Sequence, residues 1–226
     1  MAESKNTQAA PEASRDNRQE ALILKYKNAI IGVVVALIVC VCAGFLYKNY
    51  STEKFNTAST EMSKAQEYFN LAIMSNDTAM YQKALNGDGT NAGFIAVAEE
   101  GSDAGNLANL YAGLCFARLG QMEQAESYLE KYNPSDDAMV SPAAIGALAD
   151  VKASLNQLDE AVSLFVKAAQ KADNNTLSPQ LLIKAGQILE SQGKKDEALK
   201  LYEQIKAKYQ ESQEYRIIDA FIERVK

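Results

Sequence analysis

The longest apolar stretch of the chain lies near its N-terminal end. Residues 29–47, AIIGVVVALIVCVCAGFLY, contain no charged side chain. At about 1.5 Å of rise per residue, a helix of this length reaches about 28 Å, close to the ~30 Å hydrocarbon core of a bilayer. A buried helix of a soluble protein would normally carry polar residues on one face. The pattern therefore predicts a transmembrane helix over residues 29–47.

A cleaved signal peptide is the main alternative for this segment. Val41 and Ala43 resemble the small residues that precede a cleavage point. Residues 1–28 are mostly polar, however, and form a far longer leader than an ordinary charged n-region. We expect them to be a disordered tail ahead of an uncleaved anchor. A lipid anchor at Cys40 or Cys42 is disfavoured, because valine precedes each of them.

The basic residues that flank the apolar segment predict its orientation. Loops with more lysine and arginine stay on the cytoplasmic side of a membrane. This rule favours a cytoplasmic N-terminus and an exported C-terminal domain, although the difference is small and the inverse topology stays open. On the N-terminal side the residues are Arg15, Arg18, Lys25 and Lys27, and on the C-terminal side they are Lys48 and Lys54.

Beyond Tyr47 the hydrophobic residues recur with helical spacing, without sustained strand-like alternation. This pattern predicts an all-α domain. A long helix is expected over residues 49–74, followed by short helices over 77–85 and 93–100 with the turn NGDGTN between them. We interpret residues 48–104 as a linker helix and a degenerate first repeat.

Residues 105–211 contain three similar stretches, at 110–132, 146–168 and 183–205. Each has a turn residue, an alanine five positions later, and a large apolar residue four positions after that. The turn residue can adopt the left-handed conformation that ends a helix, and the alanine lets two helix backbones approach closely. The unit recurs after 36 and then 37 residues and predicts three helical hairpins. The three sets are Gly120, Ala125 and Leu129; Asn156, Ala161 and Phe165; and Gly193, Ala198 and Tyr202.

Two Ser-Pro pairs are predicted to begin the first helices of the later hairpins. In Ser141-Pro142 and Ser178-Pro179 the serine would be the N-cap and the proline the first helical residue. Residues 212–226 are expected to form a final helix. A repeat array needs such a cap, because its last repeat otherwise exposes a core face. The residues expected to cover that face are Ile217, Ile218, Phe221 and Val225.

These features resemble the tetratricopeptide repeat (TPR) family, whose period is about 34 residues. The resemblance lies in the small residues Gly113, Ala149 and Gly186, together with the turn, the alanine and the bulky residue of each unit. The usual tryptophan is missing and the units are longer. The whole layout is similar to YfgM-type ancillary translocon proteins and to single-span TPR proteins of Bacteroidota, the latter through residues 83–113. The resemblance implies a TPR-like α-solenoid.

Composition narrows the possible functions. The net charge of −6 is the wrong sign for nucleic-acid binding. The chain contains no histidine, which removes the commonest general base and metal ligand, so we expect no enzyme, no metal site and no cofactor. NGDGTN does not fit a calcium loop, because its sixth and twelfth positions are Asn91 and Val97, so a tight turn is the better interpretation. Cys115 is expected to pack in the core.

The resemblance also implies a binding surface on the concave side of the array. That face lacks the lysine and asparagine set by which some TPR domains hold a C-terminal carboxylate. About half of its residues could instead pack between repeats. The residues placed there by the TPR pattern are Leu110, Leu114, Arg118, Asp150, Ala153, Ile183, Gln187 and Glu190.

The expected function is that of a single-pass adaptor in the inner membrane, with its TPR domain in the periplasm. Its partners would be translocon, chaperone or envelope-assembly components, or exported clients. The alternative is a structural tether that self-associates as a homo-oligomer without binding clients. This second hypothesis depends on the helix at 49–74, because no other element is expected to cover its apolar residues.

Overall fold

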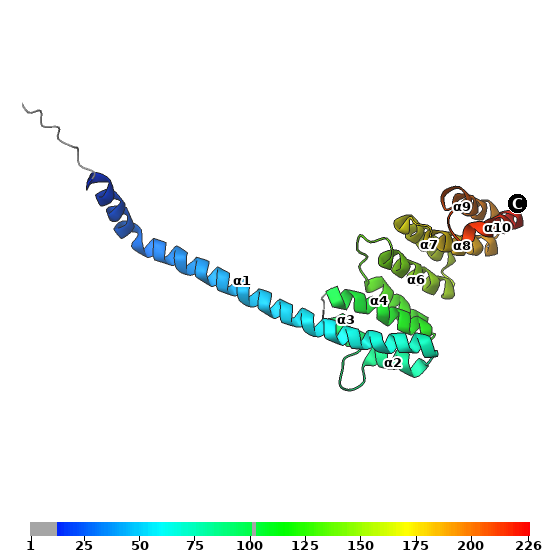
Figure 1. The fold of residues 1–226 in the computed structure, drawn as a ribbon, viewed down its shortest axis with the longest axis horizontal. Coiled ribbons are helices and arrows are strands. Elements are labelled where there is room, and N and C mark those ends of the chain that lie inside the picture. Colours follow the sequence, from blue (N-terminus) through cyan, green and yellow to red (C-terminus); the bar gives the residue numbers. More distant parts are fainter. Residues whose placement is uncertain (1–12, 101–102) are drawn as a thin grey trace, which may run out of the picture. The chain divides into compact units, whose positions relative to one another are not determined.

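The computed structural model describes residues 13–100 and 103–226, and all regular elements in these ranges are helical, with no strand (Figure 1). The chain forms two compact units, Met1–Lys54 and Phe55–Lys226. The predicted all-α class is confirmed. The helices are α1 (Ala13–Ser75), α2 (Thr78–Asn86), α3 (Phe94–Glu99), α4 (Asp103–Arg118), α5 (Met122–Lys131), α6 (Val140–Ser154), α7 (Leu158–Ala172), α8 (Ser178–Ser191), α9 (Lys195–Lys208), the 3-10 turn η1 (Glu214–Arg216) and α10 (Ile218–Val225).

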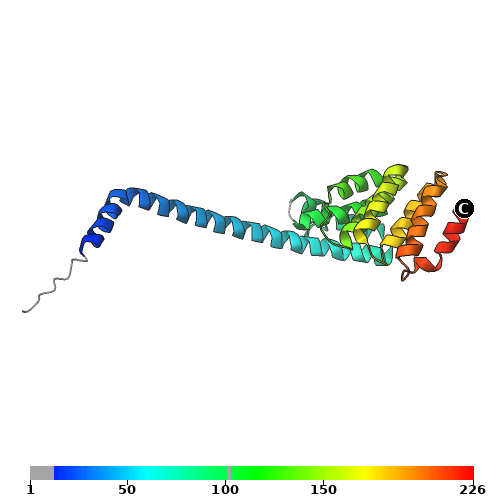
Figure 2. The same ribbon diagram turned by 90° about the horizontal axis from the view of Figure 1, so that it is seen from above.

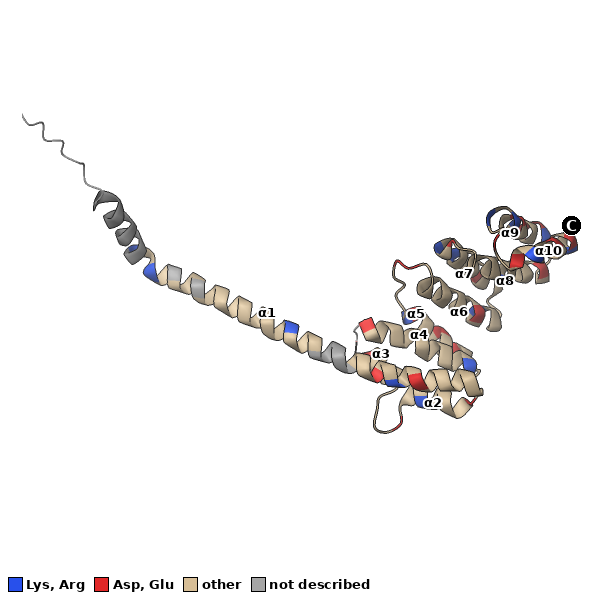
Figure 3. Ribbon diagram, viewed as in Figure 1, with Lys and Arg blue, Asp and Glu red and all other residues tan. Residues whose placement is uncertain are grey.

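The described residues of the first unit include a long apolar helical segment, Lys25–Thr52, with a mean hydropathy of 3.0. Figure 3 shows the uncharged stretch of α1 within it. The predicted span, 29–47, lies inside this segment. α1 already begins at Ala13, within the predicted polar tail, because Gln, Glu, Ala, Leu and Lys favour helix and extend one that has formed. The part of that tail over residues 1–12 lies outside the described residues.

In the second unit, the C-terminal part of α1 packs into a core with α2, α3 and α4. Its buried residues are spaced alternately by four and three positions, so they line one face of the helix. Phe69 contacts Tyr111 edge to face at 5.1 Å, and Phe94 stacks on Tyr111 at 5.2 Å. The interpretation of this helix as uncovered was therefore wrong for its inner face. That face comprises Ala58, Met62, Ala65, Phe69 and Ala72.

The three predicted hairpins are present as α4–α5, α6–α7 and α8–α9. Their turn residues Gly120, Asn156 and Gly193 have φ values of 76°, 61° and 74°, all left-handed as predicted. Each turn repeats one hydrogen bond, in which the amide after the turn residue donates to the carbonyl five residues before it, at 2.9 Å in all three. This is the pattern of a Schellman helix end. The alanines Ala125, Ala161 and Ala198 are fully buried.

In the first and third hairpins, the small residue of the first helix faces the bulky residue of the second. A Cβ on Gly113 would lie 2.6 Å from Cγ of Leu129, and one on Gly186 would collide with the Tyr202 ring. Glycine is therefore required by the close approach of the two helices. Consecutive helices pack against one another from α4 to α10, and Figure 2 shows the later ones stacked in chain order.

The Ser-Pro prediction was wrong about the capping residue. The amides at the start of α6 donate to the Asp137 carboxylate, and those of Thr176 and Leu177 donate to Oδ1 of Asn174. Ser178 is buried inside the helix and its hydroxyl donates to the Ala169 carbonyl at 2.7 Å. The serines therefore join neighbouring elements. Asp137, four positions before Ser141, caps α6, and Asn174, four positions before Ser178, holds the turn ahead of α8.

The C-terminal helix is shorter than residues 212–226. It begins at Ile218, and the residues that it buries are Ile218, Ile222 and Val225. Ile217 lies just before the helix and is 53% exposed, so its predicted place in the core was wrong. Ile222 takes that place, because it lies one helical turn after Ile218.

Candidate protein-binding groove

The first helices of the three hairpins, α4, α6 and α8, line one groove. Leu114, Asp150 and Gln187 occupy equivalent positions, each directly after the small residue that faces the second helix. One residue further along a helix is a turn of about 100°, which directs these side chains away from that contact. All three line hollows of the groove.

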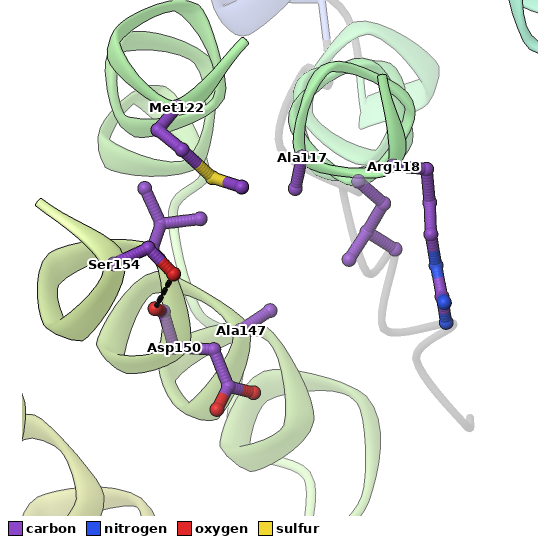
Figure 4. Close-up of a pocket in the computed structure, with 8 residues that line it drawn as sticks. Ala117, Arg118, Met122, Ala147, Asp150 and Ser154 are labelled. Carbon is purple, nitrogen blue, oxygen red and sulfur yellow. Dashed lines mark hydrogen bonds between the residues drawn. The ribbon is translucent and has the colours of Figure 1, made fainter. Parts of the chain in front are cut away.

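The central hollow lies between α4, α5 and α6 and has a volume of about 310 Å³ (Figure 4). In Figure 4, Arg118 projects from α4, Met122 from α5 and Asp150 from α6. The Ser154 hydroxyl donates to the Asp150 carbonyl at 2.9 Å, so it is satisfied within its own helix. The lining residues are Leu114, Ala117, Arg118, Met122, Ala147, Asp150, Val151 and Ser154.

Asp150 also lines a second hollow, of about 290 Å³, between α6 and α8. Here Lys184 Nζ donates to both carboxylate oxygens of Asp150 at 2.7 Å. The same ammonium lies 5.5 Å from the centre of the Phe165 ring. Asp150 is thus neutralised by the next repeat. The other lining residues are Ala153, Gln187, Ile188 and Ser191.

A third hollow, of about 320 Å³, adjoins the central one through Leu114 and is apolar throughout. It lies between α4 and the start of α6. Met139 and Val140 form its outer edge and are 50% and 47% exposed. Its remaining lining residues are Leu110, Leu114, Ala143 and Ala144.

Most of the residues predicted for the concave face line these hollows. Leu114, Arg118, Asp150, Ala153 and Gln187 do so, as does Leu110, although its side chain is largely buried in the core.

The other two predicted residues, Ile183 and Glu190, line none of the three hollows. Ile183 packs against the core, whereas the Glu190 carboxylate accepts hydrogen bonds from Arg224 and Tyr202. The Arg224 guanidinium holds the pKa of Glu190 below its usual value.

The sequence analysis did not place several lining residues of the groove, among them Lys184, Ala147, Met139 and Val140. Lys184 lies one position after Ile183, which was predicted for the groove. The position assigned to the groove in α8 was therefore shifted by one residue. Ala147 occupies the equivalent position in α6. Met139 and Val140 could have been recognised as two large apolar residues that interrupt a polar loop.

The other candidate chemistry is accounted for by packing and turns. Cys115 is fully buried, and burial raises the pKa of its thiol to about 12. The Asp88 carboxylate accepts hydrogen bonds from the amides of Thr90 and Asn91 and from the Tyr68 hydroxyl, which holds the NGDGTN turn. These hydrogen bonds keep the pKa of Asp88 well below its usual range. The part of the chain that the structure describes holds no cluster of three or more metal-ligating side chains.

Comparison with known proteins agrees with this geometry. The family described as "Tetratricopeptide repeat-like domain" matches residues 23–225. Two solved structures are similar: the nearly identical TPR-like repeats of a proposed kinesin light chain from Podosopora anserina, and a variant of the same repeats with one substitution. Each is 15% identical, covers 74% of this chain and 84% of its own, and has a TM-score of 0.54. At this identity the likeness concerns the fold alone. Comparison with curated proteins gives no match.

Proposed function

The chain belongs to the tetratricopeptide repeat-like domain family, and we propose that it is a membrane-anchored adaptor that binds other proteins through the groove along α4, α6 and α8. The observation that carries this proposal is that the three hollows adjoin one another. Leu114 lines both the apolar and the central hollow, and Asp150 lines both the central and the second hollow. Stacked helical repeats bind partners along extended concave surfaces of this kind.

The proposal includes no catalytic role. Besides apolar side chains, the groove is lined by Arg118, the Asp150–Lys184 pair, Gln187 and two serines. The hydroxyls of Ser154 and Ser191 donate to carbonyls of their own helices, and neither forms a hydrogen bond to a general base. Such a lining suits recognition of a polypeptide, where apolar contacts contribute binding energy and polar groups fix orientation.

The segment Lys25–Thr52 supports the membrane anchor. Its described side chains are exposed, and so large an apolar surface is otherwise unfavourable in water. Together with the excess of basic residues on its N-terminal side, the segment favours a TPR domain on the exported face of the inner membrane. Translocon, chaperone or envelope-assembly components, or exported clients, are the partners that we propose there.

Topology can be measured with reporters fused after Lys226. We expect an alkaline phosphatase fusion to be active and a green fluorescent protein fusion to be dark, because the first folds after export and the second does not. The reverse result would place the groove in the cytoplasm and overturn the exported part of the proposal.

Partner binding can be measured by photocrosslinking in cells. A photoreactive amino acid at Gln187, which lies in the groove, should capture other proteins. The same amino acid at Lys167, an exposed residue of α7 outside the three hollows, is the matched control. Equal capture from both positions, or none from Gln187, would argue against an adaptor.

A self-associating tether is the second candidate. Leu71, Ile73 and Met74 at the end of α1 are 45%, 51% and 85% exposed, which leaves apolar surface for a second copy. Mass measurement of the full chain in detergent tests this function. A dimer that Met74→Glu dissociates would support it, and a monomer at every concentration would exclude it.

A further inference from the structure

We infer that the α4–α6 end of the groove binds a segment of another protein in which a large apolar side chain lies beside an aspartate or glutamate. This inference rests on the proposed adaptor function and adds the chemistry of the partner. It follows from two neighbouring features of the groove, an apolar hollow and an arginine, which share Leu114 as a wall.

The apolar hollow provides the first half of the recognition. Its volume of about 320 Å³ falls within the range of pockets that bind small molecules or side chains. All six lining residues are apolar, and Met139 and Val140 remain about half exposed at its edge. An apolar side chain bound in this hollow would remove its own surface and that of the hollow from water, which favours binding.

Arg118 provides the second half. Its side chain is exposed on the wall of the central hollow, and no carboxylate among the described residues forms an ion pair with it. The acid of the same hollow, Asp150, is already held by two hydrogen bonds from Lys184. The hollow therefore carries one unpaired positive charge, which complements a negatively charged partner.

A carboxylate is the group that best fits this arginine. The guanidinium presents a planar fork of donors that can bind both oxygens of a carboxylate. Only the Leu114 side chain lies between the central hollow with its guanidinium and the apolar hollow, so one short segment can reach both. Arginine next to an apolar pocket is also a frequent centre of binding energy in protein interfaces.

The experiment uses the full chain in detergent and a pair of fluorescein-labelled peptides. Both peptides carry a pair of leucines. One helical turn away from this pair, the first peptide has a glutamate and the second has a lysine. Fluorescence anisotropy should show about tenfold tighter binding of the glutamate peptide, because the favourable charge contact becomes a repulsion in the lysine peptide. Arg118→Gln should remove the preference, and Arg118→Glu should reverse it.

Two controls separate charge from packing. Lys167→Glu makes the same charge change on α7 and should keep the wild-type preference, whereas Val140→Glu should weaken binding of both peptides. Equal binding of the two peptides, no binding of either, or a preference that Arg118→Glu leaves unchanged would overturn the inference. Capture of other proteins from Gln187 would in that case still support the adaptor function. Crosslinks from Val140 that join two copies of the chain would also overturn the inference, since the occupant would then be the chain itself.

Discussion

The carboxylate of Glu190 accepts two hydrogen bonds from the Arg224 guanidinium, from Nε and Nη2, both at 2.7 Å. This pair joins α8 of the last hairpin to the C-terminal helix α10. The hydroxyl of Tyr202 donates to the same carboxylate, and the Arg224 guanidinium lies 4.8 Å from the centre of the Phe221 ring. Glu190 therefore holds the end of the array together, although the TPR pattern placed it on the binding face.

Arg224→Ala should loosen the C-terminal helix. We expect a loss of about 1–2 kcal/mol in the free energy of unfolding, because a two-pronged charged hydrogen bond is lost and Glu190 keeps only one partner. Amide hydrogen exchange should accelerate in α10 more than in α6. Arg216→Ala is the control, since the described residues give that side chain no ion pair. Equal acceleration by both variants would contradict the assignment.

The same pair predicts a pH dependence. Arg224 lowers the pKa of Glu190 in the folded chain, so its contribution to stability is present above the unfolded pKa of about 4.3 and is lost as the pH falls through the folded value. The stability difference between wild type and Glu190→Gln should therefore be constant near neutral pH and shrink below about pH 4. Urea unfolding across this range measures it, and a constant difference down to about pH 2 would refute the prediction.

Gly186→Ala should be more damaging than Gly146→Ala, although both add one methyl group to a first helix. At Gly186 the new Cβ meets the Tyr202 ring, which cannot move without breaking its hydrogen bond to Glu190. We expect this overpacking to lower the free energy of unfolding by about 1–3 kcal/mol. At Gly146 the methyl meets only Cδ2 of Leu181, which can rotate away. Thermal unfolding of the two variants compares these sites directly.

Lys152 is a buried cation whose removal should destabilise the middle of the array. Its ammonium pairs with Glu126 from α5, and with Glu130 and Glu160 at 3.1 Å each. Glu126 raises the pKa of Lys152, so this stabilisation persists below about pH 10.4 and is lost only as the pH rises above that value. Lys152→Met should cost about 1–3 kcal/mol, because three carboxylates lose their partner. Adding Glu126→Gln to Lys152→Met should recover part of the lost stability. If the losses of the two single variants simply add in the double variant, the ion-pair network would be contradicted.

Cys115 should be unreactive while the chain is folded. Its side chain is fully buried, and its raised pKa leaves almost no thiolate at neutral pH. In a Cys40→Ser, Cys42→Ser background, maleimide should label it only at the rate of unfolding. Labelling at the rate of a free thiol would show that α4 opens readily.

The sequence predicted the repeated parts of the fold better than the parts that occur once. The turns at Gly120, Asn156 and Gly193 were predictable because each repeats a local rule of helix termination. The packing of Ala58, Met62 and Phe69 was missed, although their spacing is visible, because nothing local indicates which elements will cover a helix. The helix starts were predicted wrongly for a different reason. Asp137 and Asn174 accept hydrogen bonds from amides three residues later, and these contacts depend on the conformation of the loop ahead of each helix.

The binding role of the residues expected on the groove stays a prediction, but their positions can be compared with the hollows. Leu114, Arg118, Asp150 and Gln187 line the hollows, since residues spaced by three or four share a helix face. Lys184 was missed because its role depends on Asp150 of the preceding repeat, a contact across 34 residues of sequence. Glu190 was misplaced for the same reason, as its partner Arg224 lies another 34 residues away.

The three buried clusters do not coincide with the three hairpins. One extends from α1 to α4, the next joins α4, α5 and α6, and the last extends from α6 to α10. Deleting a single helix at a junction, α4 or α6, would therefore uncover two clusters at once. Inserting or removing a complete hairpin of 36 or 37 residues would instead leave each hairpin packed on another hairpin, as it is now. Relatives of this protein should accordingly differ in length by whole hairpins, and the groove should lengthen or shorten in the same steps.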